Sequence, residues 1–203
     1  YANKGAEPVL EEIASWHLAT TGDTALVTHL LIDHTVGKPA LYQVPLAYRR
    51  TATSGMLVGE HAGWFVYDAP HDPAYTAALL AVVTEQRRLD GEGMWVQGHR
   101  AALGVASVDS TALVSKVLTG EQSNTSIIFQ RPDGTGTPVI LKLFRALHDG
   151  DNPDVELQTA LAQAGSHSVP MPVGHLVGDW PDRGRSDGRA RGRSEERSVG
   201  KEC

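Results

Sequence analysis

Apolar and polar positions alternate along the first part of the chain. The alternating segments are rich in Val, Ile, Leu, Tyr and Thr, which favour strands. Turn-forming residues such as Gly, Asp and Pro separate them. Strands joined by such short turns pair antiparallel, so the pattern predicts a meander followed by a hairpin. The predicted strands are 9–18, 24–33, 40–49, 56–58 and 63–68.

The hydrophobic period changes to that of a helix at Asp72. This residue is a favourable N-cap, and the proline that follows it suits the first turn. Apolar positions then recur at helical spacing, and Gly91 is the predicted end. A second helix is predicted to begin after Asn152, with a proline again in its first turn, and to present Val155, Ala160, Leu161 and Ala164 on one face.

Strand patterns return between the two helices, and Asp133-Gly134 is typical of a hairpin connection. Strands grouped with strands, together with two helices, predict the α+β class. The predicted strands of this part are 94–100, 112–118, 126–130 and 139–145.

Composition excludes several classes of protein. The chain has 203 residues, of which 41% are hydrophobic, so it can bury a core. A net charge of −6 disfavours a general nucleic-acid binder. The sequence shows neither a membrane-spanning apolar run nor a signal peptide, and Cys203 alone cannot form a disulfide framework. We therefore expect a cytoplasmic protein, and because the chain starts at Tyr1 we expect it to be processed or a fragment.

The charge is unevenly distributed. Residues 182–203 hold seven basic and five acidic residues, whereas residues 1–181 hold eleven and nineteen. The tail has almost no apolar residues, so we expect it to be disordered. Its end, RSEERSVGKEC, resembles the translation of a sequencing-library adapter, which would make the tail an artefact. The alternatives are a solvated linker and a basic arm for nucleic acid.

Lys142 is the strongest single candidate for chemistry. It lies within the apolar run 139–145, where an unpaired ammonium group would be costly to bury. Glu156, on the following predicted helix, is the expected partner. Kinases use such a strand lysine and helix carboxylate to hold ATP phosphates. The alternative is a lysine on an edge strand whose ammonium group reaches water.

The loop before this pair of strands is polar. Its hydroxyls, amides and backbone N–H groups are suited to lining a phosphate, although it is not a Walker A motif. Elsewhere, the nine histidines are too scattered to predict a metal site, and the four tryptophans are read as core anchors. The candidate phosphate-loop residues are Gln122, Ser123, Asn124, Thr125 and Ser126.

Three motifs carry a resemblance to a known family. The stretches EQSNTSIIF, VILKLFR and GDNPDVEL, within residues 121–157, closely resemble the N-lobe of actinobacterial-type maltokinases. These kinases are relatives of the aminoglycoside phosphotransferases with a protein-kinase-like fold. YQVPLAY, at 42–48, resembles a strand of the family's N-terminal cap domain. The resemblance covers residues 1–181 and is loose over the cap.

The resemblance implies a division of the chain and a reaction. Residues 1–103 would form the antiparallel-sheet cap, and 104–181 the β-rich start of a kinase N-lobe. The reaction would transfer phosphate from ATP, with Mg²⁺, to the anomeric hydroxyl of maltose for α-glucan synthesis. Lys142 would contact the phosphates, Glu156 would orient it, and the polar loop would cover them. A trehalose synthase is a possible partner.

The family's catalytic Asp, Mg²⁺ ligands, adenine hinge and sugar pocket, and with them the C-lobe, belong to sequence beyond this chain. We therefore expect no catalytic or metal-binding residue here, an inactive fragment, and no tightly bound cofactor. Three alternatives stay open: a kinase for another sugar or aminosugar, a non-catalytic cap that docks on a trehalose synthase, and a nucleic-acid binder with a basic tail.

Overall fold

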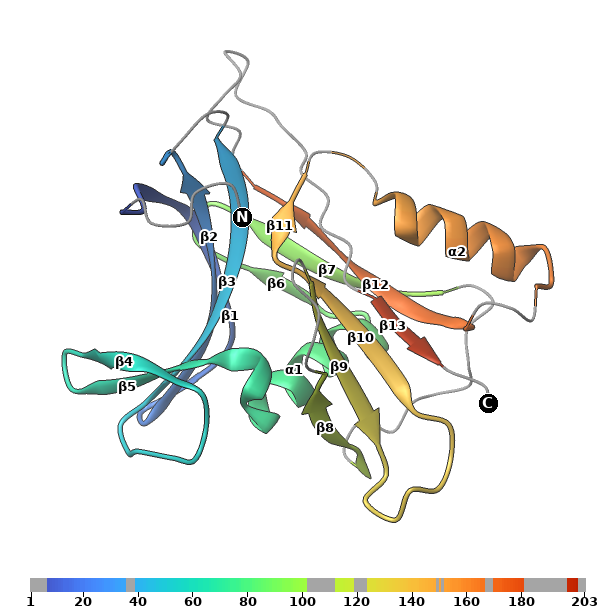
Figure 1. Cartoon of the computed structure of the whole chain (residues 1–203), viewed down its shortest axis with the longest axis horizontal. Coiled ribbons are helices and arrows are strands. Elements are labelled where there is room, and N and C mark those ends of the chain that lie inside the picture. The colour runs from blue at the N-terminus through green and yellow to red at the C-terminus, as the bar shows by residue number, and fades with distance from the viewer. Residues whose placement is uncertain are drawn as a thin grey trace.

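In the described residues, two antiparallel sheets lie on either side of the helix α1 (Pro73–Thr84) (Figure 1). The computed structural model describes residues 7–35, 39–101, 112–118, 124–148, 150, 152–166, 170–180 and 197–200. All strand pairs in these ranges are antiparallel. The predicted α+β class is thus confirmed.

Sheet A contains the predicted meander. Its strands follow the chain and then turn back in a hairpin, which projects from the body of the molecule in Figure 1. A later two-residue strand, β11 (Ala146–Leu147), pairs with the remaining edge of the third strand. Across the sheet the order is β1 (Leu10–Thr21), β2 (Thr24–Asp33), β3 (Ala40–Arg49), β5 (Trp64–Asp68) and β4 (Leu57–His61).

Sheet B is assembled from separate parts of the chain. Its first two strands lie before residue 103, within the segment that the sequence assigned to the cap, so the sheets divide the chain differently from the predicted domain boundary. The boundary itself stays a prediction. Across the sheet the order is β6 (Arg88–Asp90), β7 (Trp95–Arg100), β12 (Pro172–Asp179), β13 (Arg197–Gly200), β10 (Val139–Phe144), β9 (Asn124–Gln130) and β8 (Val114–Val117).

Strand β13 differs from the expectation of a tail without regular structure. It pairs with β10 on one side and with β12 on the other. Ladder hydrogen bonds join backbone groups, so a segment with few apolar side chains can still complete a sheet. The origin of the tail sequence remains a prediction.

Both helices begin where the sequence predicts. Asp72 Oδ1 accepts a hydrogen bond from the Ala74 N–H at 2.9 Å, and Asn152 Oδ1 accepts one from the Asp154 N–H at 3.0 Å. A short 3₁₀ helix, η1 (Ala69–His71), precedes α1, and α2 covers Pro153–Gln163. Neither α-helix of the described ranges is long and apolar enough to cross a membrane.

The predicted end of the first helix was wrong. Helix α1 stops at Thr84 rather than near Gly91, because Gln86 adopts a φ of 56° and the chain then enters β6. The predicted face of α2 was also wrong in part. Val155 and Ala162, seven residues apart, are its buried residues, whereas Ala160 is exposed.

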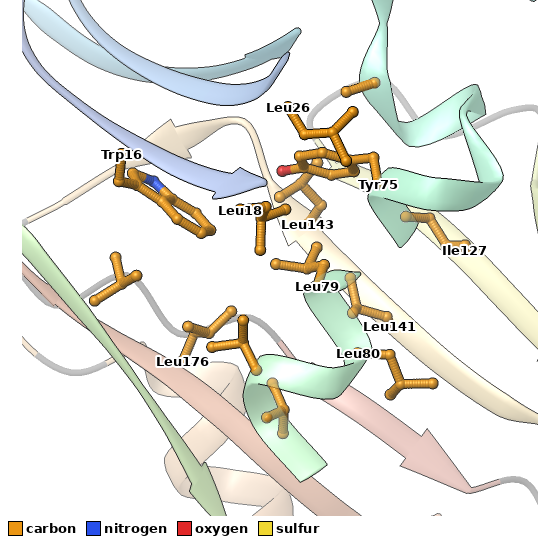
Figure 2. Packing of buried hydrophobic residues seen from close by; sticks show 14 of the residues in the cluster. Trp16, Leu18, Leu26, Tyr75, Leu79, Leu80, Ile127, Leu141, Leu143 and Leu176 are labelled. Carbon is orange, nitrogen blue, oxygen red and sulfur yellow. The ribbon is translucent and has the colours of Figure 1, made fainter. Parts of the chain in front are cut away.

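One core joins both sheets through α1. Figure 2 shows Trp16 of β1, Leu79 of α1, Leu141 of β10 and Leu176 of β12 among the side chains that fill this space. Each is no more than 2% exposed. Because a single cluster packs both sheets, we expect them to unfold together.

Hydroxyl groups fix α1 between the sheets. The Tyr75 hydroxyl lies 3.0 Å from Thr28 Oγ1 of sheet A. On the next residue of the helix, Thr76 Oγ1 lies 2.6 Å from Ser115 Oγ of sheet B. These hydrogen bonds satisfy groups that would otherwise be costly to bury.

Two glycines let α1 lie directly on sheet B. A Cβ atom at Gly98 would overlap the carbonyl oxygen of Val82, and one at Gly174 would overlap the carbonyl oxygen of His99 and lie 2.7 Å from Val83 Cγ1. Hence these positions have no room for a side chain.

Candidate functional site

Lys142 lies on the face of sheet B that points away from the core. Along β10 the buried residues Val139, Leu141 and Leu143 alternate with the half-buried Ile140, Lys142 and Phe144. The Lys142 side chain is 30% exposed, so its ammonium group reaches solvent. The apolar neighbours of Lys142 in sequence therefore lie partly on the opposite face.

The carboxylate beside Lys142 belongs to Asp154. Lys142 Nζ lies 3.5 Å from Asp154 Oδ2, in the first turn of α2. The predicted partner, Glu156, is exposed, and among the described residues it is Asp154 that forms the ion pair. Since each residue turns the helix by about 100° and Val155 faces inward, residues 154 and 156 point to opposite sides of α2.

Only part of the predicted phosphate loop can be placed. Gln122 and Ser123 lie outside the described residues, and Asn124, Thr125 and Ser126 open strand β9. In the pairing with β10, Ser126 is opposite Lys142 and Asn124 is opposite Phe144, so both share the face of Lys142. Thr125 is opposite Leu143 and belongs to the other face.

Thr125 is instead held by Arg145. Arg145 Nε donates to Thr125 Oγ1 at 3.0 Å, and Arg145 Nη2 donates to Asp68 Oδ1 at 3.0 Å and Oδ2 at 3.3 Å. Asp68 is the last residue of β5. This arginine therefore bridges the β9–β10 hairpin of sheet B and the edge of sheet A.

A second set of hydrogen bonds reinforces this connection. The Arg145 carbonyl accepts from the Gln43 N–H at 2.9 Å, and the Phe144 carbonyl accepts from Gln43 Nε2 at 2.6 Å. Gln43 is only 3% exposed. Within three residues after Lys142, the backbone is thus hydrogen-bonded to sheet A. Strand β11 then pairs with β3.

Sequence reasoning missed Asp154, Arg145 and Asp68 as members of this arrangement. No sequence signal selects Asp154, because Asp154 and Glu156 lie on either side of the inward-facing Val155, and the placement of α2 decides which carboxylate faces the lysine. Arg145 and Asp68 are 77 residues apart, and only the tertiary fold brings them together.

The remaining candidates have mainly structural contacts. Trp16 and Trp180 are buried core residues as predicted, whereas Trp64 and Trp95 are half-buried, with the guanidinium groups of arginines over their rings. In the part of the chain that the structure describes, no three metal-ligating side chains converge on one point.

The N-terminal part of the chain matches a known domain. The family model of the maltokinase N-terminal cap domain matches residues 1–72. The match ends at Asp72, the N-cap of α1, and so contains β1 to β5 of sheet A. It supports the resemblance that YQVPLAY indicated and connects this segment of the protein with the maltokinases.

Proposed function

We propose that the chain is the N-terminal part of an ATP-dependent sugar kinase resembling maltokinase, which forms maltose 1-phosphate in the cytoplasm. The observation that carries the proposal is the pair of Lys142 on a strand and Asp154 on the following helix, at 3.5 Å. A strand lysine held by a helix carboxylate is the arrangement with which kinases position ATP phosphates. The cap-domain match at residues 1–72 supports it independently.

The groups around Lys142 fit a phosphate. An ammonium group has three donors, so donors remain after the contact with Asp154. Its side chain is partly exposed, and the half-buried Asn124 lies on the same face of the sheet, whereas Ser126 on that face is buried. Lys142 would donate to phosphate oxygens, Asp154 would keep its ammonium group over the sheet, and Asn124 would add an amide donor.

ATP supplies the phosphoryl group in this proposal. By the family resemblance, the general base and the Mg²⁺ ligands belong to later sequence. What these residues contribute is the position of the phosphates and partial neutralisation of their charge. Glu156 would take the place of Asp154 only after a rotation of α2, since the two side chains point to opposite sides of the helix.

The alternatives differ in whether they require Lys142. A kinase for another sugar or aminosugar would use Lys142 in the same way, because in this proposal Lys142 contacts ATP and not the sugar acceptor. A cap that only docks on a trehalose synthase would not need Lys142 at all. The effect of substituting Lys142 therefore distinguishes the two kinase hypotheses from the docking hypothesis.

The decisive experiment uses the longer protein that continues this sequence. With ATP, Mg²⁺ and maltose, ³¹P NMR should show maltose 1-phosphate, and Lys142→Ala should lower kcat/KM by about 100-fold or more. The matched control is Lys116→Ala, an exposed lysine on β8 of the same sheet, which should keep full activity. Equal activity of Lys142→Ala and the control would refute the assignment.

A companion experiment uses the 203-residue chain itself. Its ¹H–¹⁵N spectrum should respond weakly to millimolar ATP, at residues of β9 and β10 around Lys142. The response should disappear in Lys142→Ala and persist in Lys116→Ala. Tight, Mg²⁺-dependent binding would contradict the expectation that the metal ligands belong to later sequence.

A further inference from the structure

A concave site lies in the part of the chain that matches the cap domain, around the junction of β3, β5 and α1. Its volume is about 280 Å³, close to the lower end of small-molecule sites. The lining combines buried polar groups at its base with an exposed loop at its rim. The lining residues that matter here are Arg49, Thr53, Tyr67, Asp68, His71 and Asp72.

The charges in this cavity are already balanced in pairs. Asp72 is 8% exposed and accepts from Arg49 Nε at 2.8 Å and Nη2 at 2.6 Å. Asp68 is paired with Arg145 in the same way. Since each guanidinium group faces a carboxylate, the cavity lacks the uncompensated positive charge that would select a phosphate or carboxylate ligand.

Hydrogen-bonding capacity nevertheless remains at the base. The Tyr67 hydroxyl accepts from the Thr53 N–H at 2.8 Å, which leaves its own proton to donate. An ionised carboxylate has about four acceptor sites, and Asp68 uses two of them for Arg145. His71 lies 3.8 Å from Asp68 and adds a ring nitrogen.

Gly55 and Met56 provide apolar surface at the rim, beside these polar groups. Gly55 lies close over the Tyr67 ring, since a Cβ atom there would lie 3.1 Å from Tyr67 Cδ1. Met56 is 57% exposed at the rim. An acceptor carboxylate, a phenol donor and this apolar surface together suit a molecule that has both hydroxyl groups and a C–H face.

We propose that this cavity binds a small, neutral, polyhydroxylated molecule of the monosaccharide or polyol class. Two adjacent hydroxyls of the ligand donate to Asp68, the Tyr67 hydroxyl donates to a ligand oxygen, and His71 contacts a third hydroxyl. The site is distinct from the Lys142 face of sheet B, and it does not depend on kinase activity.

Occupation of the cavity has a second observable consequence. Asp68 holds Arg145, and Arg145 holds Thr125 of β9. A ligand that shares the Asp68 carboxylate changes the environment of this bridge. The amide signal of Thr125 should therefore shift together with those of the lining residues.

The test is a ¹H–¹⁵N NMR titration of the 203-residue chain with D-glucose and with sorbitol, up to about 100 mM, because small ligands of this kind bind in the millimolar range. We expect saturable shifts at Tyr67, His71 and Thr125. D-Glucose 6-phosphate is the charged comparison and should bind more weakly than glucose, because no guanidinium or ammonium group among the described lining residues is without a carboxylate partner.

Two variants localise the effect. Tyr67→Phe, which removes the donor hydroxyl and with it the acceptor of the Thr53 N–H, should weaken binding about threefold to tenfold, and His71→Ala should weaken it to a similar extent. The matched controls are Tyr42→Phe, on the outer face of β3, and His61→Ala, an exposed histidine of β4; both should leave the affinity unchanged.

Three results would overturn the proposal. The first is the absence of saturable shifts at the lining residues with either probe. The second is an affinity that Tyr67→Phe and His71→Ala leave unchanged. The third is tighter binding of glucose 6-phosphate than of glucose, which would contradict the neutral class of ligand.

Discussion

Sheet A and sheet B are built from the chain in different ways. Strands β1 to β5 of sheet A come from residues 10–68 and lie beside their neighbours in sequence, apart from the β4–β5 exchange at the edge. Sheet B draws on four separate stretches between residues 88 and 200. Pairing strands that are close in sequence costs little loop-closure entropy. Pairing distant strands costs more, and the contacts of the rest of the fold must offset that cost.

The two sheets are nevertheless one packing unit in the described residues. Helix α1 contacts both, and Arg145 and β11 carry the chain from sheet B onto the edge of sheet A. Because one core joins both sheets, we expect the segment that matches the cap-domain model to unfold with the rest of the fold and not as a separate domain.

The largest effect is expected in the shared core. Leu79 on α1 is fully buried between the sheets, so Leu79→Ala should lower the free energy of unfolding by about 2–5 kcal/mol. The control, Leu157→Ala, removes a leucine that is 60% exposed and should change it by less than about 0.5 kcal/mol. Urea unfolding followed by hydrogen exchange should show sheets A and B losing protection together. Survival of sheet A alone in Leu79→Ala would establish two independent units.

The next effect concerns sheet A and the start of α1. Arg49→Ala leaves the Asp72 carboxylate buried without its guanidinium partner and should destabilise by about 2–3 kcal/mol. Asp72→Asn keeps an N-cap acceptor for α1 and should cost less. The comparison is made by thermal unfolding of both variants at pH 7. Equal losses would mean that the unpaired buried carboxylate adds no cost beyond that of the lost ion pair.

A smaller effect is expected at the bridge between the sheets. Arg145→Ala should cost about 1–2 kcal/mol because it removes hydrogen bonds to Asp68 and Thr125. A double-mutant cycle with Asp68→Asn should give a coupling energy above about 0.5 kcal/mol. By contrast, Lys142→Ala, which removes an exposed pair, should change stability by less than about 0.5 kcal/mol. If the effects of the two substitutions on the free energy of unfolding were additive, the contact between Arg145 and Asp68 would not help to join the sheets.

The smallest effect is a pH dependence within sheet A. Burial, and then the negative charge of Glu12, raise the pKa of Tyr48 above its ordinary value of 10.0. The folded state therefore keeps this proton longer than the unfolded chain does. The resulting contribution is complete below about pH 10 and is lost as the pH rises through the raised value.

Tyr48→Phe should accordingly flatten the alkaline fall in stability above about pH 10. At neutral pH it loses the hydrogen bond between the Tyr48 hydroxyl and His29 Nε2, at 2.9 Å, so each variant is normalised to its own value at pH 7. Urea midpoints measure the effect. An unchanged alkaline slope would show that other groups dominate it.

How far the sequence predicts the fold follows the same contrast. The bounds of β2 and β3, and the caps Asp72 and Asn152, were predicted correctly because pattern and capping chemistry are local. Strand β12 was not predicted, because its two glycines and its proline are weak strand formers. Gly174 is needed where the strand packs against Val83 of α1, and this contact is visible only in the fold. The end of α1 was predicted wrongly because Gln86 adopts a left-handed conformation, which is not expected for a glutamine.

The candidate site was predictable in kind but not in its partners. Lys142 follows from an apolar strand with one cation, whereas the choice of Asp154 over Glu156 depends on the rotation of α2. The contact of Thr125 with Arg145 required strand register, because it decides which side chains share a face. The pocket at Tyr67 and Asp68 required the tertiary fold.

The glycines under α1 set a limit on how this protein can vary. Since Gly98 and Gly174 leave no room for even a methyl group, substitution there would push the helix off both strands. In a saturation library selected for folded protein, we expect these two positions to accept almost no alternative, although neither has a side chain that takes part in chemistry. Invariance at such sites would record the spacing between a helix and a sheet, and would be misread as the mark of an active site.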